Sequence, residues 1–446
     1  MSTACERLRI LYLAQVMPYP SRSGAQWVVL ANLCYLAARH DVRLVCRAGS
    51  AASPDPIKVL RERVGCREVI EFDPDQPGDW AARSYLGDAF FRGCLTSQNL
   101  QRLLPPLCRW AEVIQVESLG LAFNLFRVLR TLRLPRRPAV VLRLHDVMSV
   151  VTAERATHDR PSTRLVRRLV PPSVRSALLR RRAGQYRRLE ASIYECLDGI
   201  VVFSAEDEEL VRRLAPRARV AWIPMGADPV SPVPSRGQAG GGHRTLTFVG
   251  WMGWPPNADA AIRFVRDILP RLSDLELRVL IVGEGPPPEL RKYDDGSRVR
   301  VLGYVPDLEA IWQSTDVAVV PVRFGTGVKT KTLDALLHGI PVVAYPEGRR
   351  GVAVTPGVDF LEAATSEAFA DSVRRLLTDP EFYRRIAENG RQAVVARHSA
   401  AAAGAQLEAF YAELRGAADE GLSPGATGLA PAKGASQGSP RDLQSG

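Results

Sequence analysis

The sequence predicts an α/β protein built from two parallel-sheet domains that face each other across a cleft. The first half opens with a strand, a helix and a second strand within residues 10–46, which is the βαβ unit of a parallel sheet. A second αβ series occupies residues 245–322, and a stretch rich in Pro, Gly and Ser at 226–242 separates the two series. Two parallel sheets of similar size place their carboxyl ends around a common cleft.

The individual elements follow from apolar runs and their periodicity. In the first half we expect a helix at 25–39 and strands at 10–14, 42–46, 69–72, 113–116, 139–144 and 199–203. In the second half we expect helices at 257–272 and 307–314 and strands at 245–250, 277–283, 299–303 and 317–322. The predicted organisation is an N-terminal domain at 1–225, a linker at 226–243, a C-terminal domain at 244–415 and a disordered tail at 416–446.

Composition excludes several classes of protein. An apolar share of 46% and a charged share of 24% are ordinary for a globular chain, and no run of 18 apolar residues predicts a membrane span. The net charge is +11, but the arginines are spread widely and no nucleic-acid-binding motif interrupts the αβ pattern, so we expect no nucleic-acid partner. The seven cysteines lack CxxC spacing, which favours reduced cysteines in a cytoplasmic protein and argues against zinc.

The segment from Pro321 to Ala335 carries the clearest chemistry. It joins the end of an apolar strand to the glycine loop Gly325-Thr326-Gly327, and then to Lys329 and Lys331 at the start of a leucine-patterned helix. Loop N–H groups and a helix dipole therefore converge on one point, as they do in phosphate sites. Only five lysines occur in 446 residues, so two of them here favour a compact ammonium over mere positive charge. The alternative is an ordinary solvated first turn.

Two further polar groups are predicted near this loop. His145-Asp146 follows an apolar run, which places an imidazole at the carboxyl end of a strand. His145 is either a structural histidine or a donor of a hydrogen bond to substrate hydroxyls. Asp334 lies three residues after Lys331 on one helical face, where it either pairs with that lysine or accepts hydrogen bonds from ribose hydroxyls.

Metal and cofactor motifs are weak in this sequence. Asp73-Pro74-Asp75 has the DxD spacing of a divalent-cation site, but its proline and the Gln76-Pro77-Gly78 that follows favour an acidic turn. The GxGxxG fingerprint is missing after the first strand, which argues against nicotinamide and flavin cofactors. We therefore expect no cofactor and no metal. A departing diphosphate would then be stabilised by Lys329, Lys331 and the loop amides.

An arginine-dense stretch lies between Arg155 and Arg188. It holds eleven arginines with leucine and valine interleaved. We favour a surface helical hairpin with a solvated basic face, and the alternative is a peripheral contact with the inner face of an anionic membrane.

Motifs in the second half, in this order and spacing, resemble family 4 retaining glycosyltransferases of the GT-B fold. The resemblance is strongest to the sugar transferases of bacterial exopolysaccharide clusters. It rests on FVGWMGWPPN at 248–257, LIVGEG at 280–285, GYVPD at 303–307, and GTGVKTK at 325–331 with GIPVV at 339–343. The N-terminal half is looser, and resembles the family in Met17-Pro18-Tyr19-Pro20 with Ser23-Gly24 and in His145-Asp146.

This resemblance implies two Rossmann-like domains, with a nucleotide-sugar donor bound mainly by the C-terminal one, an acceptor bound mainly by the N-terminal one, and no required metal. It assigns the diphosphate to Lys331 with help from Lys329, the ribose to Asp334, and the transferred sugar to His145. The implied donor-binding residues are Gly24, Gly250, Asn257, Gly283, Glu284, Tyr304, Val305, Gly325, Thr326, Gly327, Lys329, Lys331 and Asp334. Many members have two glutamates separated by seven residues where this chain has Thr326 and Asp334, so sugar-side contacts differ.

The expected function is a metal-independent, hexosyltransferase-like retaining glycosyltransferase. It would move a sugar from a nucleoside diphosphate to a glycan or lipid-linked acceptor in cell-surface or exopolysaccharide synthesis. Two alternatives stay open. A GT-B nucleotide-sugar epimerase would need acid and base groups facing the sugar ring, which the sequence does not identify. A noncatalytic nucleotide-sugar binding protein would bind donor without turnover.

Overall fold

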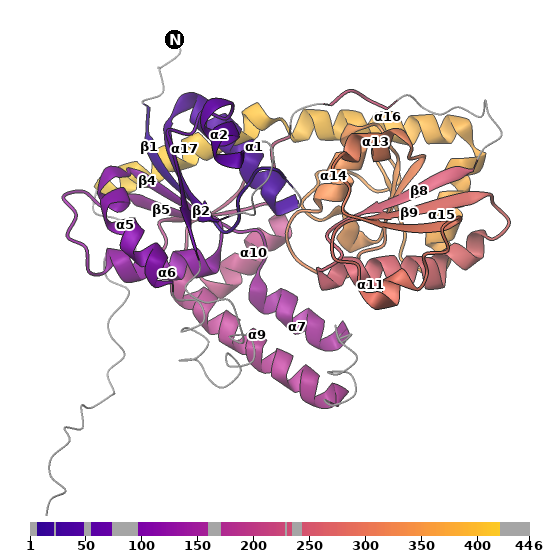
Figure 1. Ribbon diagram of the computed structural model, residues 1–446, viewed down its shortest axis with the longest axis horizontal. Helices are drawn as coiled ribbons and strands as arrows, with labels where there is room; N and C mark the ends of the chain where they lie inside the picture. Colours follow the sequence, from indigo (N-terminus) through magenta and orange to yellow (C-terminus); the bar gives the residue numbers. More distant parts are fainter. Residues whose placement is uncertain are drawn as a thin grey trace, which may run out of the picture.

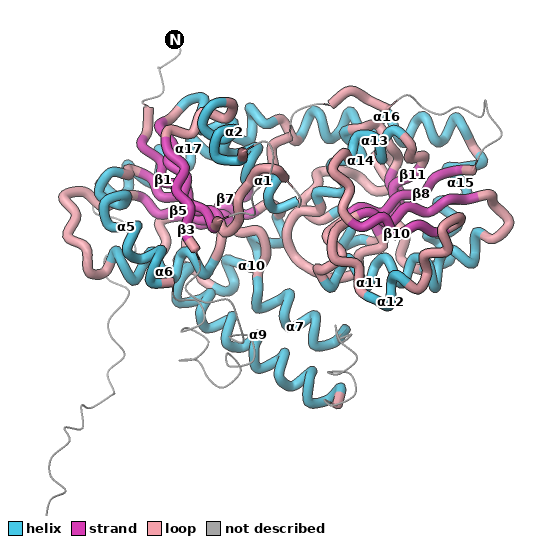
Figure 2. Tube along the Cα trace, viewed as in Figure 1, coloured by secondary structure: helices cyan, strands magenta, loops and turns pink. Residues whose placement is uncertain are grey.

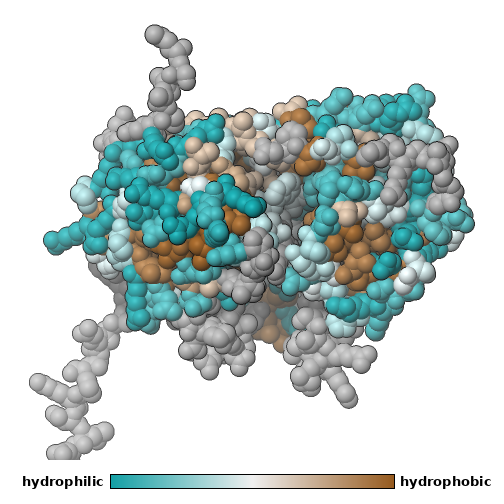
Figure 3. All heavy atoms as spheres, turned by 45° about the horizontal axis from the view of Figure 1, so that its top comes forward, coloured by the Kyte–Doolittle hydropathy of each residue, from teal (hydrophilic) through white to brown (hydrophobic). Residues whose placement is uncertain are grey.

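A computed structural model of the chain describes residues 7–21, 24–48, 55–73, 97–158, 171–227, 230–233 and 243–419. Two α/β domains lie side by side, and each has a central sheet with helices packed around it (Figures 1 and 2). In a space-filling view, polar residues cover most of the visible surface, with a patch of apolar residues on each domain (Figure 3).

The N-terminal sheet has seven strands in the order β3-β2-β1-β4-β5-β6-β7. All of its pairs are parallel, and β1 pairs with β2 on one side and with β4 on the other. The strands are β1 Arg9–Ala14, β2 Asp41–Arg47, β3 Glu68–Phe72, β4 Val113–Val116, β5 Ala139–Arg143, β6 Gly199–Val202 and β7 Val220–Trp222. The expected strands of this half are therefore present, and β7 is an additional one.

Helices cover both faces of this sheet because its strands are apolar on both faces. One face packs against α5 Gln98–Trp110, α6 Leu119–Leu129, α9 Pro172–Tyr194 and α10 Ala205–Leu214. The other packs against α1 Gly24–Arg39, α2 Pro56–Glu62 and α17 Ala400–Asp419. Successive residues of β1 alternate between the two layers, as strand geometry requires: Leu11 and Leu13 lie in the first, Ile10 and Tyr12 in the second.

The C-terminal sheet has six parallel strands in the order β10-β9-β8-β11-β12-β13. They are β8 Arg244–Val249, β9 Leu277–Val282, β10 Val299–Gly303, β11 Val317–Val320, β12 Val342–Ala344 and β13 Leu361–Glu362. The helical segments are α11 Pro255–Arg263, η1 Phe264–Ile268, η2 Leu269–Leu272, α12 Pro288–Arg291, α13 Leu308–Gln313, α14 Thr330–Leu337, η3 Pro346–Arg349, α15 Ser366–Thr378 and α16 Pro380–Arg397. The single helix expected at 257–272 is thus three consecutive pieces, of which η1 is a π turn and η2 a 3-10 turn.

The last helix of the described chain returns to the first domain. After α16 covers the C-terminal sheet, α17 crosses back and lies along the N-terminal domain (Figure 1). Phe410 and Leu414 are buried in the N-terminal core, and the Tyr411 hydroxyl donates a hydrogen bond to Gln115 on β4. The structure therefore differs from the expected boundary at 415, because composition does not show which sheet a helix covers. The expected tail begins inside α17, and residues 420–446 lie outside the described part.

Helices α7 Met148–His158 and α9 pack side by side and project from the N-terminal domain (Figure 1). Residues 159–170 between them lie outside the described part of the chain. The described ends of the arginine-dense stretch therefore form a helical pair at the surface. No helix within the described ranges is both long and apolar enough to cross a membrane.

Candidate functional site

A cavity of about 580 Å³, counting space open to solvent, lies where the two domains meet. The N-terminal domain contributes the start of α1 and the residues after β5, and the C-terminal domain contributes the rest of the lining. The lining residues are Gly24, Ala25, Val28, His145, Asp146, Trp254, Pro256, Asn257, Val322, Phe324, Gly325, Thr326, Gly327, Val328, Lys329, Thr330 and Lys331. The glycine loop, both lysines and His145 are therefore brought together.

The domains approach each other closely enough to need glycine at two positions. Gly327 has a φ of 75°, and a Cβ atom there would lie 2.0 Å from the His145 carbonyl oxygen. A Cβ atom on Gly24, at the start of α1, would lie 2.2 Å from the Thr330 Oγ1. Side chains at these positions would push the domains apart, so both glycines set the width of the cavity.

Lys331 is the cation that remains available at the cavity. It occupies the first turn of α14, and its Nζ lies 6.0 Å from the centre of the Phe248 ring. Within the described residues it has no hydrogen bond and no ion pair. Burial, together with the charge of Lys329, lowers the pKa of Lys331 to about 7. Asp146 opposes this shift, and an anion in the cavity would add to its effect and raise the pKa of Lys331 further.

Lys329 has a different environment from the one expected. Its Nζ donates hydrogen bonds to the carbonyl oxygens of Gly325, Thr326 and Gly327, each at 3.1 Å. An ammonium has three donors, so the loop uses all of them. Burial lowers the pKa of Lys329, while the nearby Glu347 and Asp146 oppose that change. Lys329 therefore fixes the shape of the loop and has no donor left for a phosphate.

The loop amides are also occupied, by carboxylates of the other domain. Gly325 N donates to Glu154 on α7 at 2.8 Å, and Gly327 N donates to Asp207 on α10 at 3.3 Å. Asp207 also pairs with Arg350 at 2.8 Å. We expected these two amides to hold a diphosphate, but in this structure they donate to carboxylates. They hold the N-terminal domain instead.

Thr326 completes this connection between the domains. Its hydroxyl donates to Asp146 Oδ1 at 3.1 Å and accepts from Val147 N at 2.9 Å. Burial raises the pKa of Asp146 to about 6, although Lys329 and the Thr326 hydroxyl oppose the shift. The residue that departs from the family pattern is thus used for domain contact.

His145 is oriented by a carboxylate that the sequence analysis did not identify. Its Nε2 lies 2.6 Å from Glu117 Oε2, at the carboxyl end of β4. Glu117 is buried and also accepts from Tyr12 and Gln115. Burial alone would raise the pKa of Glu117, but the hydrogen bond and charge of His145 lower it below the ordinary value. An ionised Glu117 keeps the proton on Nε2, so in the neutral ring Nδ1 is an acceptor rather than the expected donor.

Asp334 is not among the residues that line the cavity. Its Oδ2 accepts from Trp312 Nε1 at 2.9 Å, and its Oδ1 lies 3.4 Å from His338 Nδ1. Burial raises the pKa of Asp334, with His338 and Trp312 acting against that shift. Asp334 therefore pairs with His338 and Trp312, and not with Lys331.

The other predicted donor-binding residues lie in turns at the carboxyl ends of the C-terminal strands, except for Asn257, which lies in the first turn of α11. Asn257 lines the cavity and donates to the Trp251 carbonyl at 2.9 Å. Gly283 N donates to the Gly303 carbonyl at 2.7 Å, which joins the turns after β9 and β10. Gly250, Gly283, Glu284, Tyr304 and Val305 do not line the cavity. The Tyr304 side chain is exposed.

Three carboxylates, Glu117, Glu154 and Asp207, belong to the site but were missed. Glu117 follows an apolar strand just as His145 does, so the same strand-end signal could have found it. Glu154 and Asp207 lie on helices and gave no such signal. Of the possible metal turn, only Asp73 is described, and Pro74-Asp75 lie outside the described residues. Within the described ranges, no group of three or more His, Cys, Asp or Glu side chains is placed to hold a metal ion.

Comparison with known proteins connects this geometry to a family. Residues 243–379 match the family described as "Glycosyl transferases group 1". The chain is 28% identical over 155 residues to an alpha-D-kanosaminyltransferase of Streptomyces kanamyceticus. That alignment spans 31% of this chain and 38% of the relative. The stretch of this chain that matches the family includes the glycine loop and both lysines.

Solved structures resemble the chain over both domains. A sucrose-phosphate synthase from Thermosynechococcus elongatus has a TM-score of 0.66 at 18% identity, covering 92% of this chain and 100% of that one. The Anabaena protein Alr3699/HepE, solved in complex with UDP-glucose, has a TM-score of 0.61 at 15% identity, covering 91% and 100%. The chain therefore has the GT-B fold, and its residues 243–379 form a domain of the glycosyl transferases group 1 type.

Proposed function

We propose that this chain is a retaining glycosyltransferase that moves a sugar from a nucleoside diphosphate to a glycan or lipid-linked acceptor. The observation that carries the proposal is the ammonium of Lys331. It stands in the first turn of α14, in the cavity between the domains, and it makes no hydrogen bond and no ion pair with the described residues, although the charge of Asp146 acts on it. The match to the glycosyl transferases group 1 family over this segment supports a sugar donor.

Lys331 would bind the donor diphosphate together with the positive end of the α14 dipole. A cation already placed in the cavity needs little reorganisation as charge develops on the departing diphosphate, which is how such contacts accelerate transfer. Lys329 would act through the loop that it holds. We propose that these groups stabilise the leaving group without a required metal and without a cofactor.

His145 would bind the transferred sugar from the opposite domain. With Glu117 holding the proton on Nε2, Nδ1 accepts a hydrogen bond from a sugar hydroxyl. The paired domains would exclude water and align the acceptor hydroxyl with the anomeric carbon. In front-face displacement the acceptor oxygen bonds to that carbon as the bond to the diphosphate breaks. The diphosphate oxygen then takes the acceptor's proton, and the configuration is retained.

The nucleoside would lie beyond the diphosphate, along the turns after β8, β9 and β10. Tyr304, whose side chain is 43% exposed, would border the base, and Asp334 would accept from the ribose. Asp334 is shorter by one carbon than the glutamate of the family. Its oxygens keep acceptor capacity beyond their bonds to Trp312 and His338, since a carboxylate has about four lone-pair sites.

The acceptor and the cellular location belong to the same proposal. Helix α9 presents exposed Val174 and Leu178, and Arg180, Arg181 and Arg187 on the same helix are also exposed. Exposed apolar and basic side chains on one projecting helix suit a peripheral contact with an anionic surface. We therefore propose a cytoplasmic protein that acts at the inner face of the membrane in cell-surface or exopolysaccharide synthesis. Sedimentation with anionic liposomes, lost in Arg180→Glu/Arg181→Glu, would support this; equal recovery with neutral liposomes would contradict it.

The proposal is tested first by donor binding. A panel of nucleoside diphosphates and their sugars should raise the unfolding midpoint by mass action, and ligand at 100 times Kd stabilises by about 2.7 kcal/mol. Lys331→Ala should lose this response. Lys292→Ala is the matched control, because Lys292 is an exposed lysine of the same domain. Equal binding by both variants would remove Lys331 from the site.

Product analysis then separates the proposal from its alternatives. Donor incubated with lipid extracts and oligosaccharides should give a glycosylated product whose anomeric configuration, read by NMR, matches the donor. Conversion of the donor alone into an isomer would identify an epimerase. Donor binding without turnover on any acceptor would identify a binding protein, and absence of nucleotide binding would overturn the proposal.

A further inference from the structure

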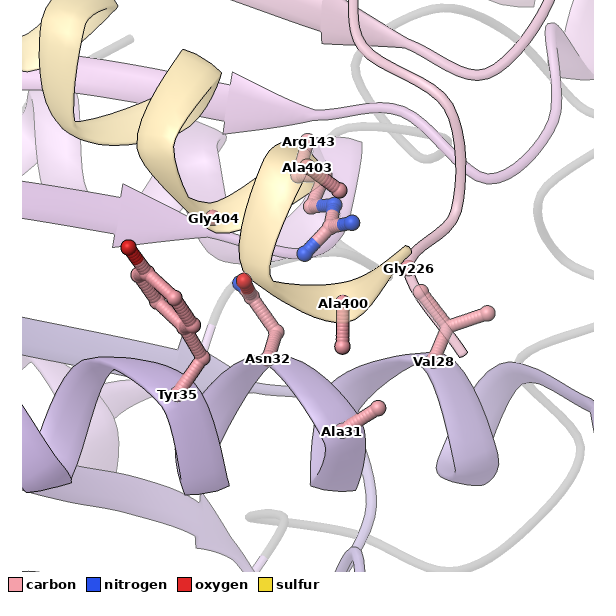
Figure 4. Close-up of a pocket in the computed structure, with 9 residues that line it drawn as sticks. All are labelled: Val28, Ala31, Asn32, Tyr35, Arg143, Gly226, Ala400, Ala403 and Gly404. Carbon is pink, nitrogen blue, oxygen red and sulfur yellow. The ribbon is translucent and has the colours of Figure 1, made fainter. Parts of the chain in front are cut away.

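A second cavity lies between the N-terminal domain and the described connections to the C-terminal domain, and it shares the lining residue Val28 with the first cavity. It has a volume of about 290 Å³, counting space open to solvent, and lies between α1, the end of β5, the linker and the first turns of α17. Its lining residues are Val28, Ala31, Asn32, Tyr35, Arg143, Gly226, Ala400, Ala403 and Gly404 (Figure 4). It does not share His145, Lys331 or the glycine loop with the first cavity.

Arg143 points into this cavity from the last position of β5 (Figure 4). It is 4% exposed, and its Nε and Nη1 are buried without a hydrogen-bond partner. Among the described residues it has no ion pair, and its only close aromatic contact is the Phe203 ring, 4.8 Å from its guanidinium carbon. Buried N–H groups without an acceptor are costly, so an anion at this position would be stabilised.

The carboxylates in this part of the core do not supply that anion. Glu117 is bound by Tyr12, Gln115 and His145. Glu408 on α17 is bound by His40 at 3.0 Å and by the Tyr35 hydroxyl at 3.1 Å. Neither makes an ion pair with Arg143 within the described chain. The charge of Arg143 does act on Glu117 from a distance, but the guanidinium Nε and Nη1 are left without an acceptor beside the cavity.

The first turn of α17 adds a second attraction for an anion. The helix runs from Ala400 to Asp419, and its positive end lies at the cavity beside Arg143. Ser399 accepts from two of its early amides, from Ala402 N through its hydroxyl at 3.3 Å and from Ala403 N through its carbonyl at 3.0 Å. Asn32 faces the same space from α1, and its amide donates to the Tyr12 hydroxyl at 3.2 Å (Figure 4). A guanidinium, helix amides and a carboxamide together match a tetrahedral oxyanion.

The cavity also adjoins both described chain connections between the domains. Ala227 N donates to the His398 carbonyl at 2.8 Å, and His398 Nδ1 lies 3.0 Å from the Met225 carbonyl oxygen. Gly226 and Ala400, the next residues along these two connections, line the cavity. A ligand in this cavity would contact both chain connections between the domains.

We propose that this cavity binds a small tetrahedral oxyanion of the size of inorganic phosphate, and that its occupancy stiffens the hinge between the domains. The volume, which counts space open to solvent, corresponds to about ten water molecules at about 30 Å³ each, which is room for an oxyanion but too little for a nucleotide sugar. The site is distinct from the proposed donor site, so it stands independently of the transferase proposal.

The test is the response of the full chain to inorganic phosphate at constant ionic strength, with chloride as the balancing anion. Phosphate should raise the unfolding midpoint of the natural chain more than chloride does. Arg143→Met should weaken phosphate binding at least about tenfold, the scale of one lost hydrogen bond to a charged group. Lys331→Met is the control, because phosphate could also enter the donor cavity. It should keep the response.

A second variant covers the case in which Arg143→Met does not fold. Asn32→Asp is nearly isosteric and places a carboxylate in the cavity, so it should abolish the phosphate response by supplying the anion internally. Loss of the response in Lys331→Met with retention in Arg143→Met or Asn32→Asp would overturn the site. An unresponsive natural chain would do so too.

Hydrogen exchange tests the effect on the hinge. Phosphate should slow exchange in residues 225–227 and 398–404 of the natural chain and leave exchange in Arg143→Met or Asn32→Asp unchanged. Sulfate should act like phosphate if only the tetrahedral dianion is recognised, and a sugar phosphate should act only if the ligand is a phosphorylated metabolite. Phosphate binding without slower exchange at these residues would contradict the hinge role.

Discussion

The glycine loop at 325–327 and the first turn of α14 are neighbours in the chain but make opposite kinds of contact. Two amides, the threonine hydroxyl and three carbonyls of the loop are all hydrogen-bonded, either to the N-terminal domain or to Lys329. Lys331, in the first turn of α14, has no such partner among the described residues. The loop therefore connects the two domains, whereas the start of the helix presents a lysine to the cavity without a hydrogen-bond partner.

The difference explains why two lysines in one short motif have different roles. A cation surrounded by carbonyls gains its energy in folding, and it cannot contribute the same donors to a ligand. A cation left without a partner costs stability, and that cost is recovered only when an anion arrives. The lowered pKa of Lys331, about 7, is the sign of this second arrangement.

The largest expected effect is on turnover in Lys331→Met. We expect a loss of about 10² to 10³ in kcat/KM, the scale of one preorganised charged contact to the leaving group. The free energy of unfolding should not fall, because the change removes a buried cation that lacks a partner. Steady-state kinetics and urea unfolding measure the two. Transfer rates close to those of Lys292→Met would contradict the assignment.

Lys329→Met should mainly lower the free energy of unfolding, whereas Lys331→Met should mainly lower turnover. It leaves three carbonyl oxygens of the loop without their donor, at about 1 to 3 kcal/mol for each buried group. Removal of a desolvated charge offsets part of this, so we expect a net loss of about 3 kcal/mol in the free energy of unfolding. Urea denaturation, with Lys292→Met as control, measures it. A variant as stable as the natural chain would show that Lys329 does not hold the loop.

The depressed pKa of Lys331 predicts how donor affinity depends on pH. In the free protein Lys331 loses its proton near pH 7, whereas its bound form keeps it, so the affinity for a nucleoside diphosphate should fall up to about tenfold per pH unit from about pH 7 to about pH 9. A nucleoside-diphosphate sugar is the ligand to use, because it has no terminal phosphate group that titrates near pH 7. Calorimetric titration should show this slope in the natural chain and a flat profile in Lys331→Ala. A flat natural profile would show that the pKa is not depressed.

The depressed pKa of Lys331 also makes the stability of the free protein depend on pH. Stability should rise with pH, whereas donor affinity should fall. The pKa of Lys331 is lower in the folded chain than the ordinary value of about 10.4, so the unfolded chain binds more protons between these values. The cost of burying the charge is fully present below about pH 7 and is relieved as pH rises. In Lys331→Met the stability of the free protein should therefore rise less steeply over this interval.

The sequence predicted the sheets well because each strand is a short apolar run whose burial does not depend on distant residues. The Val317–Val320 strand and the glycine loop after it are readable in this way. His145 and Lys331 were placed at the cleft because strand ends and helix starts of parallel sheets gather at one edge. Strand ends and helix starts can be recognised from the local sequence, and the geometry of a parallel sheet then places them at one edge.

The contacts between domains were not predictable in the same way. Glu154 and Asp207 reach the loop from helices far away in the sequence, and an acidic residue on a helix looks the same whether it faces solvent or a partner domain. The three hydrogen bonds of Lys329 to the loop were not predicted for a related reason. Its spacing from the glycines fits a phosphate and fits three carbonyls equally well. The position of α17 likewise depends on which core its apolar side chains reach.

The smallest expected effect is that of Thr326→Val, which tests the domain contact without touching either lysine. Its hydroxyl is replaced by a methyl group, so Val147 N loses its acceptor and Asp146 loses a donor. We expect a loss of about 1 kcal/mol in the free energy of unfolding and a further rise in the pKa of Asp146, since a hydrogen bond to its charged form is gone. Thr378→Val, at an exposed threonine of α15, is the control for the threonine-to-valine change itself. If Thr326→Val matches this control while small-angle scattering shows unchanged domain spacing, then the carboxylates on Gly325 and Gly327 suffice to hold the domains, and the threonine is free to vary with the donor sugar.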